Sequence, residues 1–160
     1  MQKITVLCVG KLKERFYQEA AAEYVKRLGR HCKLDVVELP ESRLPEDPSP
    51  GEIQRALAAE AAAIREKLPR GGAVIALCIE GKQISSEELA QFLADRANSG
   101  AGDVAFVIGS SHGLSDEVKR AAALRFSMGR ITMPHQLARL VLTEQIYRAC
   151  TINAGMKYHK

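Results

Sequence analysis

The sequence has no long hydrophobic run. Its only apolar stretch near the start, Ile4 to Val9, is far shorter than the roughly 20 residues that cross a membrane as a helix. That stretch also lacks the small-residue cleavage site of a signal peptide. The sequence therefore argues against a membrane or secreted protein, and we expect a cytosolic one.

Metal-ligand and disulfide patterns are missing as well. The four cysteines, Cys8, Cys32, Cys78 and Cys150, form no Cys-x-x-Cys pair, and the histidines have no ligand spacing. We therefore predict neither a metal site nor a disulfide framework. The cysteines are expected to be buried structural thiols.

Two motifs of common enzyme classes are absent too. No Gly-x-Gly-x-x-Gly follows the first apolar run and no Gly-Lys-Ser/Thr phosphate loop is present, which argues against dinucleotide enzymes and NTPases. The cluster Ser110-Ser111-His112, between Gly109 and Gly113, fits the letters of the Gly-x-Ser-x-Gly elbow. Because adjacent residues rarely point toward each other, we do not interpret the serines and the histidine as the nucleophile and base of a hydrolase.

What is present is the composition of an ordinary globular protein. Of the 160 residues, 46% are hydrophobic and 26% are charged, which predicts one folded domain over residues 1–160. The 23 basic residues outnumber the 19 acidic ones and give a net charge of +4. This balance mildly favours a polyanionic partner.

Alternating apolar runs and amphipathic stretches predict an α/β fold. Strands are expected at 4–9, 34–39, 73–79 and 104–108, and helices at 14–30, 52–68, 85–98, from 115 onward and at 136–150. In the first helix an apolar residue recurs every fourth position, with two more beside the repeat, and all are expected on the buried face: Phe16, Ala20, Tyr24 and Leu28, with Ala21 and Val25. Short connections between apolar strands predict a parallel sheet covered by helices on both faces. The proline-rich stretch 40–51 is expected to be a mobile loop.

Candidate binding residues follow the expected strands. Ligands of open parallel sheets bind beyond the carboxyl ends of the strands, and three such ends stand out, at 77–81, 108–113 and 127–135. In the second, Gly109 and Gly113 would let the backbone approach a ligand closely. Glycine spacing alone is equally well explained by a plain turn.

Several ordered motifs resemble one known family. They are Cys8-Val9-Gly10-Lys11-Leu12-Lys13-Glu14, Ile108-Gly109 through Gly113-Leu114, Thr132-Met133-Pro134-His135-Gln136 with Arg139, Glu144-Gln145-x-Tyr147-Arg148-Ala149, and Tyr158-His159-Lys160. Together they make the chain similar, along its whole length, to the SPOUT-class methyltransferases that modify N3 of a pseudouridine in 23S ribosomal RNA.

The resemblance implies a fold, a cofactor and partners. It implies a SPOUT fold with a trefoil knot near the C-terminus, S-adenosylmethionine held by the knot loops, and a homodimer that acts on 23S rRNA in the assembled 70S ribosome. By position, the cofactor contacts would be Leu77, Gly109, Met128, Gly129, Arg130, Ile131, Thr132 and Met133. The family usually has a second glycine where this chain has Ser110. Because Gly109 and Gly113 remain, we expect the cofactor site to be kept.

The segment 128–133 also suits an adenosine ligand on its own terms. Met128, Ile131 and Met133 would supply apolar walls, and Gly129 between them would free the backbone for the polar edge of adenine. From the sequence alone, a buried strand followed by a turn is the simpler interpretation of the same residues.

The last expected helix is apolar on more than one side. Leu137, Leu140 and Val141 mark one face, and Leu142, Ile146 and Ala149 mark another. A helix with two apolar faces needs two burial partners, so one face would cover the sheet and the other a second subunit. We expect Leu142 and Ile146 at the interface between the subunits.

Three basic residues in or just before that helix are candidates for chemistry or RNA contact. An imide nitrogen must lose its proton before methylation, so His135 is the candidate base, and Arg139 would stabilise negative charge or contact RNA. A capping histidine and a solvated arginine are the simpler alternatives. Arg148 is a further candidate RNA contact, but an ion pair with Glu144 one turn earlier explains it at least as well.

The end of the chain combines rings with cations. Tyr158 and His159 would stack on an exposed base while Lys157 and Lys160 meet phosphate. We hypothesise that this tail closes over a flipped nucleotide in the active site of the partner subunit. A frayed, dispensable end is the commoner fate of such a segment.

Two other functions remain open from the sequence. One is a SPOUT methyltransferase that acts on another RNA, for instance a tRNA ribose. The other is a ribosome-associated binding protein without catalysis. Because 160 residues leave no room for an appended RNA-binding domain, we expect a substrate with a large preformed surface, such as an assembled ribosome.

Overall fold

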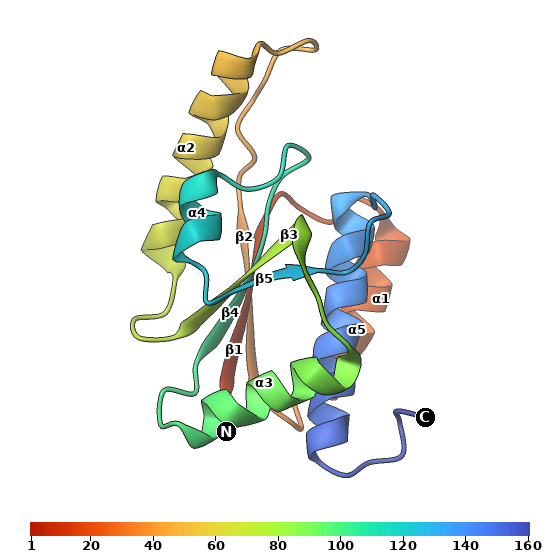
Figure 1. Cartoon of the computed structure of the whole chain (residues 1–160). Helices are drawn as coiled ribbons and strands as arrows, with labels where there is room; N and C mark the ends of the chain where they lie inside the picture. Colours follow the sequence, from red (N-terminus) through yellow and green to blue (C-terminus); the bar gives the residue numbers. More distant parts are fainter.

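The computed structural model describes residues 1–160 as alternating strands and helices (Figure 1). In chain order the elements are β1 (Lys3–Val9), α1 (Arg15–Leu28), β2 (Lys33–Leu39), α2 (Pro50–Lys67), β3 (Ala73–Gln83), α3 (Ser86–Asn98), β4 (Val104–Ile108), α4 (Asp116–Ala121), β5 (Leu124–Ser127) and α5 (His135–Asn153). Every strand and helix expected from the sequence is present. The short strand β5, which the sequence pattern does not delimit, is added.

The five strands form one sheet in which every neighbouring pair is parallel. Their order is β2-β1-β4-β3-β5. All residues of the inner strand β4 are buried. Burial on both faces explains why β1 and β4 are apolar without alternation.

Helices cover both faces of the sheet (Figure 1). Helices α1, α3 and α5 pack on one face, and α2 and α4 pack on the other. In β1, Ile4 and Val6 belong to the first core and Leu7 and Val9 to the second, because successive side chains of a strand point to opposite faces. The predicted α/β arrangement is thus confirmed, whereas the knot stays a prediction. No helix is both long and apolar enough to cross a membrane.

Serine caps fix the starts of two helices near the sheet edge. The Ser85 hydroxyl accepts a hydrogen bond from the backbone N–H of Glu88, whose carboxylate accepts one from the Ser85 N–H in return. Ser115 caps α4 by accepting from the N–H of Val118. Each capping serine stands at the residue where the sequence predicts its helix to begin.

The buried face of α1 differs from the expected one. Leu28 is fully buried, but Phe16 is 63% exposed and Val25 is 37% exposed. The Phe16 ring instead contacts that of Tyr17 in the same helix, with ring centroids 4.5 Å apart. A four-residue repeat drifts around a helix of 3.6 residues per turn, so its first member has left the buried face.

The expected placement of α5 is also wrong in one respect. Leu142 and Ile146 are 0% exposed within a single chain, where they join the core between α5 and the sheet. They therefore cannot form an interface with a second subunit. Helix α5 packs against α1 and α3 as well as the sheet. Two of its sides are therefore buried within one chain, which explains its apolar residues on more than one face. Leu137, Leu140 and Val141 are half-buried.

The connection between β2 and α2 contains no helix or strand, as its prolines predict. It is attached at two points. The Ser42 N–H donates a 2.9 Å hydrogen bond to the buried carboxylate of Glu60 in α2. Glu41 accepts a 3.0 Å hydrogen bond from the Ser111 hydroxyl, beyond the end of β4. The connection thus reaches the edge of the sheet where the strands end, and its expected mobility stays a prediction.

Candidate functional site

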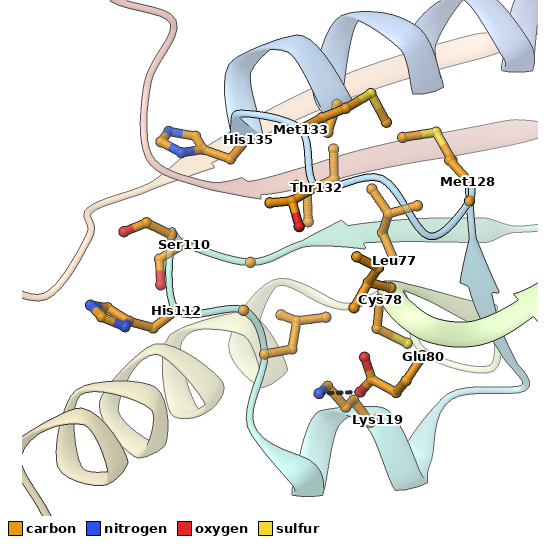
Figure 2. A pocket seen from close by; sticks show the side chains of 18 of the residues that line it. Leu77, Cys78, Glu80, Ser110, His112, Lys119, Met128, Thr132, Met133 and His135 are labelled. Carbon is orange, nitrogen blue, oxygen red and sulfur yellow. Dashed lines mark hydrogen bonds and ion pairs between the residues drawn. The ribbon is translucent and has the colours of Figure 1, made fainter. Parts of the chain in front are cut away.

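A cavity of about 350 Å³ opens at the carboxyl ends of β3, β4 and β5 (Figure 2). Its walls come from all three strand ends that the sequence pattern indicates. They are residues 77–80, 108–114, and 128, 129 and 131–133, together with Lys119, His135 and Ala138. Of the residues expected to contact the cofactor, all line the cavity except Arg130.

The glycine loop after β4 closes on itself. Gly113 has a φ of +82°, and its N–H donates a 2.9 Å hydrogen bond to the carbonyl of Ser110. A Cβ atom at Gly109 would lie 2.2 Å from the carbonyl oxygen of Gly113, which no side chain tolerates. The loop itself therefore requires glycine at position 109, and the approach of a ligand to its backbone stays a prediction.

Ser110 occupies the family's usual glycine position without strain. No residue other than glycine has a positive φ in this chain, so the serine backbone lies in an ordinary region. Its side chain is buried at the cavity wall. The departure from the family pattern therefore leaves the loop intact.

The loop after β5 is held by one hydroxyl group. Ser127 Oγ lies 2.9 Å from the carbonyl oxygen of Ile79 and accepts a 3.2 Å hydrogen bond from the N–H of Gly129. Gly129 has a φ of +125°, with open space where a side chain would be. Beyond it, the backbone groups of residues 130–133 make no hydrogen bond within the chain. These groups remain available to a ligand.

The end of β3 bulges into the cavity. Leu77 and Lys82 both pair with Phe126 of β5, so the four residues between them leave the ladder. Within this bulge Glu80 accepts a 2.5 Å hydrogen bond from Lys119 of α4. That bond lowers the pKa of the Glu80 carboxyl. Cys78 lines the same wall, and burial raises the pKa of its thiol.

His135 stands at the first residue of α5 and lines the cavity. Its Nε2 atom would lie 3.4 Å from a Cβ built on Gly10, so a side chain at Gly10 would crowd the imidazole. The N–H of Lys13 donates a 2.8 Å hydrogen bond to the Gln136 side chain. The segment after β1 is thereby fixed against the start of α5, next to the histidine.

Arg139 lies outside the cavity. Its guanidinium forms a 2.7 Å ion pair with Glu38 of β2, and its side chain is 12% exposed. The same pair acts on the nearby thiol of Cys8, whose pKa is raised to about 11 mainly by burial. The structure therefore brings His135, but not Arg139, to the cavity.

The C-terminal tail packs against its own chain and is not frayed. The Tyr158 hydroxyl donates a 3.0 Å hydrogen bond to Glu144, which also pairs with Arg148 at 2.5 Å. His159 lies 2.7 Å from the Glu87 carboxylate. The expected pair Glu144–Arg148 is thus present. The tail docks beside the second half of α5, whereas the cavity lies at the start of this helix, which is about 28 Å long.

Three residues of the cavity region were not among the predicted binding or catalytic residues, although Glu80 and Ser127 lie in the predicted segments 77–81 and 127–135. Ser127 joins two cavity walls, and Glu80 and Lys119 place charge in one of them. Glu80 follows an expected strand end, which is a usable signal. No sequence pattern around Lys119 or Ser127 indicates that they contact Glu80 and Ile79, respectively.

Comparison with known proteins gives a consistent family. The model of the family described as "Predicted SPOUT methyltransferase" matches residues 2–159. The protein named "Ribosomal RNA large subunit methyltransferase H" from Streptococcus equi subsp. zooepidemicus is 48% identical over 158 residues, which are 99% of each chain. The protein of the same name from Ligilactobacillus salivarius is 49% identical over 157 residues, 98% of this chain and 99% of the relative.

A solved structure shares the fold. The crystal structure of a probable methyltransferase from Bordetella pertussis matches with a TM-score of 0.57 and covers 93% of this chain and 94% of its own. Its sequence identity is 16%, so the likeness concerns the fold alone.

Proposed function

The chain belongs to the SPOUT methyltransferase family, and from this we propose that it methylates large-subunit ribosomal RNA at N3 of a pseudouridine. Relatives almost half identical over nearly the whole chain are named for methylation of that RNA. The methyl donor of this type of enzyme is S-adenosylmethionine. The choice of nucleotide follows from the ordered motifs that resemble the N3-methyltransferases.

The cavity carries the proposal because it fits this donor. Its volume lies within the usual range for small-molecule sites, about 300–1,000 Å³. Leu77, Met128 and Met133 give apolar walls for an adenine ring, as Figure 2 shows for all three. The unpaired backbone groups of 130–133 would bind its polar edge. Bound there, S-adenosylmethionine supplies a methyl group on a sulfonium, ready for attack by a nucleophile.

His135 is proposed to take the proton from the target nitrogen. It is the titratable side chain nearest the start of α5, and Figure 2 shows it at the end of the cavity opposite Glu80 and Lys119. Imidazole is the side chain most suited to general-base catalysis close to neutral pH. Arg139 is proposed to anchor α5 to β2 through Glu38, since its guanidinium does not line the cavity.

We further propose that the enzyme is a homodimer with shared active sites. Within one chain, Tyr158 and His159 are held beside the second half of α5, away from the cavity. They reach a cavity only if it belongs to another copy. The half-buried residues Leu137, Leu140 and Val141 lie on the first half of α5, near the cavity, and would form part of the interface.

The proposed substrate is tested by comparing methylation of three RNA substrates. Labelled S-adenosylmethionine is incubated with 70S ribosomes, free 23S rRNA or tRNA, and the labelled nucleotide is identified after digestion. We expect label in ribosomes, on a pseudouridine, and little in free rRNA or tRNA. The variant His135→Ala is the matched control and should bind the donor but transfer far less label. Label mainly in tRNA, or none in any RNA, would contradict the proposal.

A further inference from the structure

One charged pair lines the cavity and takes no part in the proton transfer proposed above. Glu80 of β3 and Lys119 of α4 meet at 2.5 Å. Apart from the two histidines, the other lining side chains are apolar or uncharged. Figure 2 shows the pair near Cys78 and Leu77, at the far end from His135.

The bulge of β3 fixes where the Glu80 carboxylate points. Because Leu77 and Lys82 pair with the same residue of β5, the chain between them leaves the ladder, and within it Glu80 meets Lys119 of α4. One carboxylate oxygen then accepts the hydrogen bond from Lys119. In Figure 2 the second oxygen is turned away from the lysine, toward the side where Cys78 lies.

The Glu80 carboxylate can act only as a hydrogen-bond acceptor. A glutamate is ordinarily ionised at neutral pH, and the hydrogen bond from Lys119 lowers the pKa of Glu80 further. The pair as a whole adds no net charge to the cavity wall. Such a wall suits a neutral donor, and vicinal sugar hydroxyls are such donors. Carboxylates near the carboxyl ends of parallel strands bind ribose in this way in dinucleotide sites.

We propose that Glu80, held by Lys119, accepts a hydrogen bond from a ribose hydroxyl of the methyl donor. The inference rests on the proposed function, because it takes S-adenosylmethionine as the ligand. Leu77 and Met128 hold the adenine, so the attached sugar lies beside them and within reach of the bulge. Lys119 is a positioning residue, since it orients the carboxylate.

The test removes the hydroxyl and the carboxylate separately and together. Calorimetry measures binding of S-adenosylhomocysteine and of its 2′-deoxy and 3′-deoxy analogues to the wild type and to Glu80→Ala. In the wild type, loss of the accepted hydroxyl should weaken binding about tenfold or more, as for a hydrogen bond to a charged group. Glu80→Ala should bind S-adenosylhomocysteine more weakly than the wild type by a similar factor. For this variant, the same deoxy analogue should bind less than about twofold more weakly than S-adenosylhomocysteine.

A matched control uses the same helix as Lys119. Glu117 lies on α4 and forms an ion pair with Arg65 outside the cavity, so Glu117→Ala should keep the full dependence on the hydroxyl. Circular dichroism checks that each variant is folded. Should Glu80→Ala not fold, Glu80→Gln preserves the shape of the side chain and should show the same loss in smaller degree.

Three results would overturn the assignment. If each deoxy analogue lost as much affinity in Glu80→Ala as in the wild type, Glu80 would not contact the sugar. If Glu80→Ala weakened S-adenosylhomocysteine but not 5′-methylthioadenosine, which lacks the amino-acid group, the pair would bind that group instead. A wild type that does not bind S-adenosylhomocysteine at all would refute the proposed function itself, which is a distinct outcome.

Discussion

Ser127 joins two walls of the cavity through one hydroxyl group. On one side it meets the carbonyl of Ile79 in the β3 bulge, and on the other the N–H of Gly129. The serine is 2% exposed, so neither contact is replaced easily by water. A single residue behind the cavity therefore sets the distance between the segments proposed to hold adenine.

Removing that hydroxyl should loosen the site without unfolding the protein. We expect Ser127→Ala to weaken binding of S-adenosylhomocysteine about tenfold, because two backbone groups lose their partner at a cost of about 1–3 kcal/mol. Calorimetry measures the affinity. Ser99→Ala is the control, since Ser99 is exposed and bonds only to Arg96 in its own helix. Equal affinities for both variants would show that the two walls hold their positions without Ser127.

Gly109 should tolerate not even one methyl group. Its Cβ would collide with the backbone of Gly113, so Gly109→Ala should open the loop, lower the thermal midpoint and weaken S-adenosylhomocysteine at least about tenfold, equivalent to 1.4 kcal/mol. Gly71→Ala is the matched control. Gly71 has a φ of +74° and open space around it, and it lies outside the cavity. Donor affinity unchanged in Gly109→Ala would refute the role given to the loop.

At the scale of elements, different parts of α5 have different roles, both along its length and around its axis. Its first residue, His135, lines the cavity, while its second half holds the tail. One side of the helix, with Leu142 and Ile146, fills the core. Another side, with Leu140, is only half-buried in one chain.

The two sides of α5 should respond differently to substitution. Leu142→Ala should destabilise folding by about 2–5 kcal/mol, the usual cost of such a cavity in a core, as measured by urea unfolding. Leu140→Glu should leave a folded chain but lower the sedimenting mass, because it places an unpaired charge in the proposed interface. If Leu140→Glu retained the mass of the wild type, this side of α5 would not be the interface.

The sequence predicts most elements but little of their mutual placement. The apolar runs of β1 and β4 and the serine caps of α3 and α4 are local signals, and the structure confirms them. Leu142 and Ile146 are apolar whether they meet the sheet or a partner, so periodicity could not choose between the two. Arg139 was expected at the cavity because it lies four residues after His135 and shares its helix face. Its ion-pair partner Glu38 lies about a hundred residues earlier in the chain, where no local pattern reveals it. The bulge that presents Glu80 depends on pairing with β5, which no local pattern encodes.

At the scale of the whole molecule, the tail should be needed for transfer but not for donor binding. We expect a chain that ends at Met156 to bind S-adenosylhomocysteine and to dimerise as the wild type does, while methylation of ribosomes falls at least about tenfold, or 1.4 kcal/mol. The physical reason is that extrusion of the target base costs a few kcal/mol, which stacking on Tyr158 and His159 would offset. Near-normal methylation by the shortened chain would show the tail to be dispensable.

Mixed dimers test whether the tail acts across the subunits. Chains without the tail are mixed, after dissociation and reassociation, with Gly109→Val chains that keep the tail but lack a working cavity. Each mixed dimer contains one intact cavity beside one intact tail, so about a quarter of wild-type activity should return if assembly is random. A mixture as inactive as its components would contradict a shared site.

The order of the strands has a consequence for how the protein becomes active as it is made. Strand β1 needs β4 as a neighbour, and β4 lies almost a hundred residues later in the chain; pairings so distant in sequence form slowly. All three walls of the cavity come from residues 77 onward, and the last of them is completed only by the segment before α5. A growing chain on the ribosome therefore has no complete cavity until the start of α5 has emerged and β5 has joined the edge of the sheet. If the cavity binds the methyl donor as proposed, donor binding reports that the sheet has been completed.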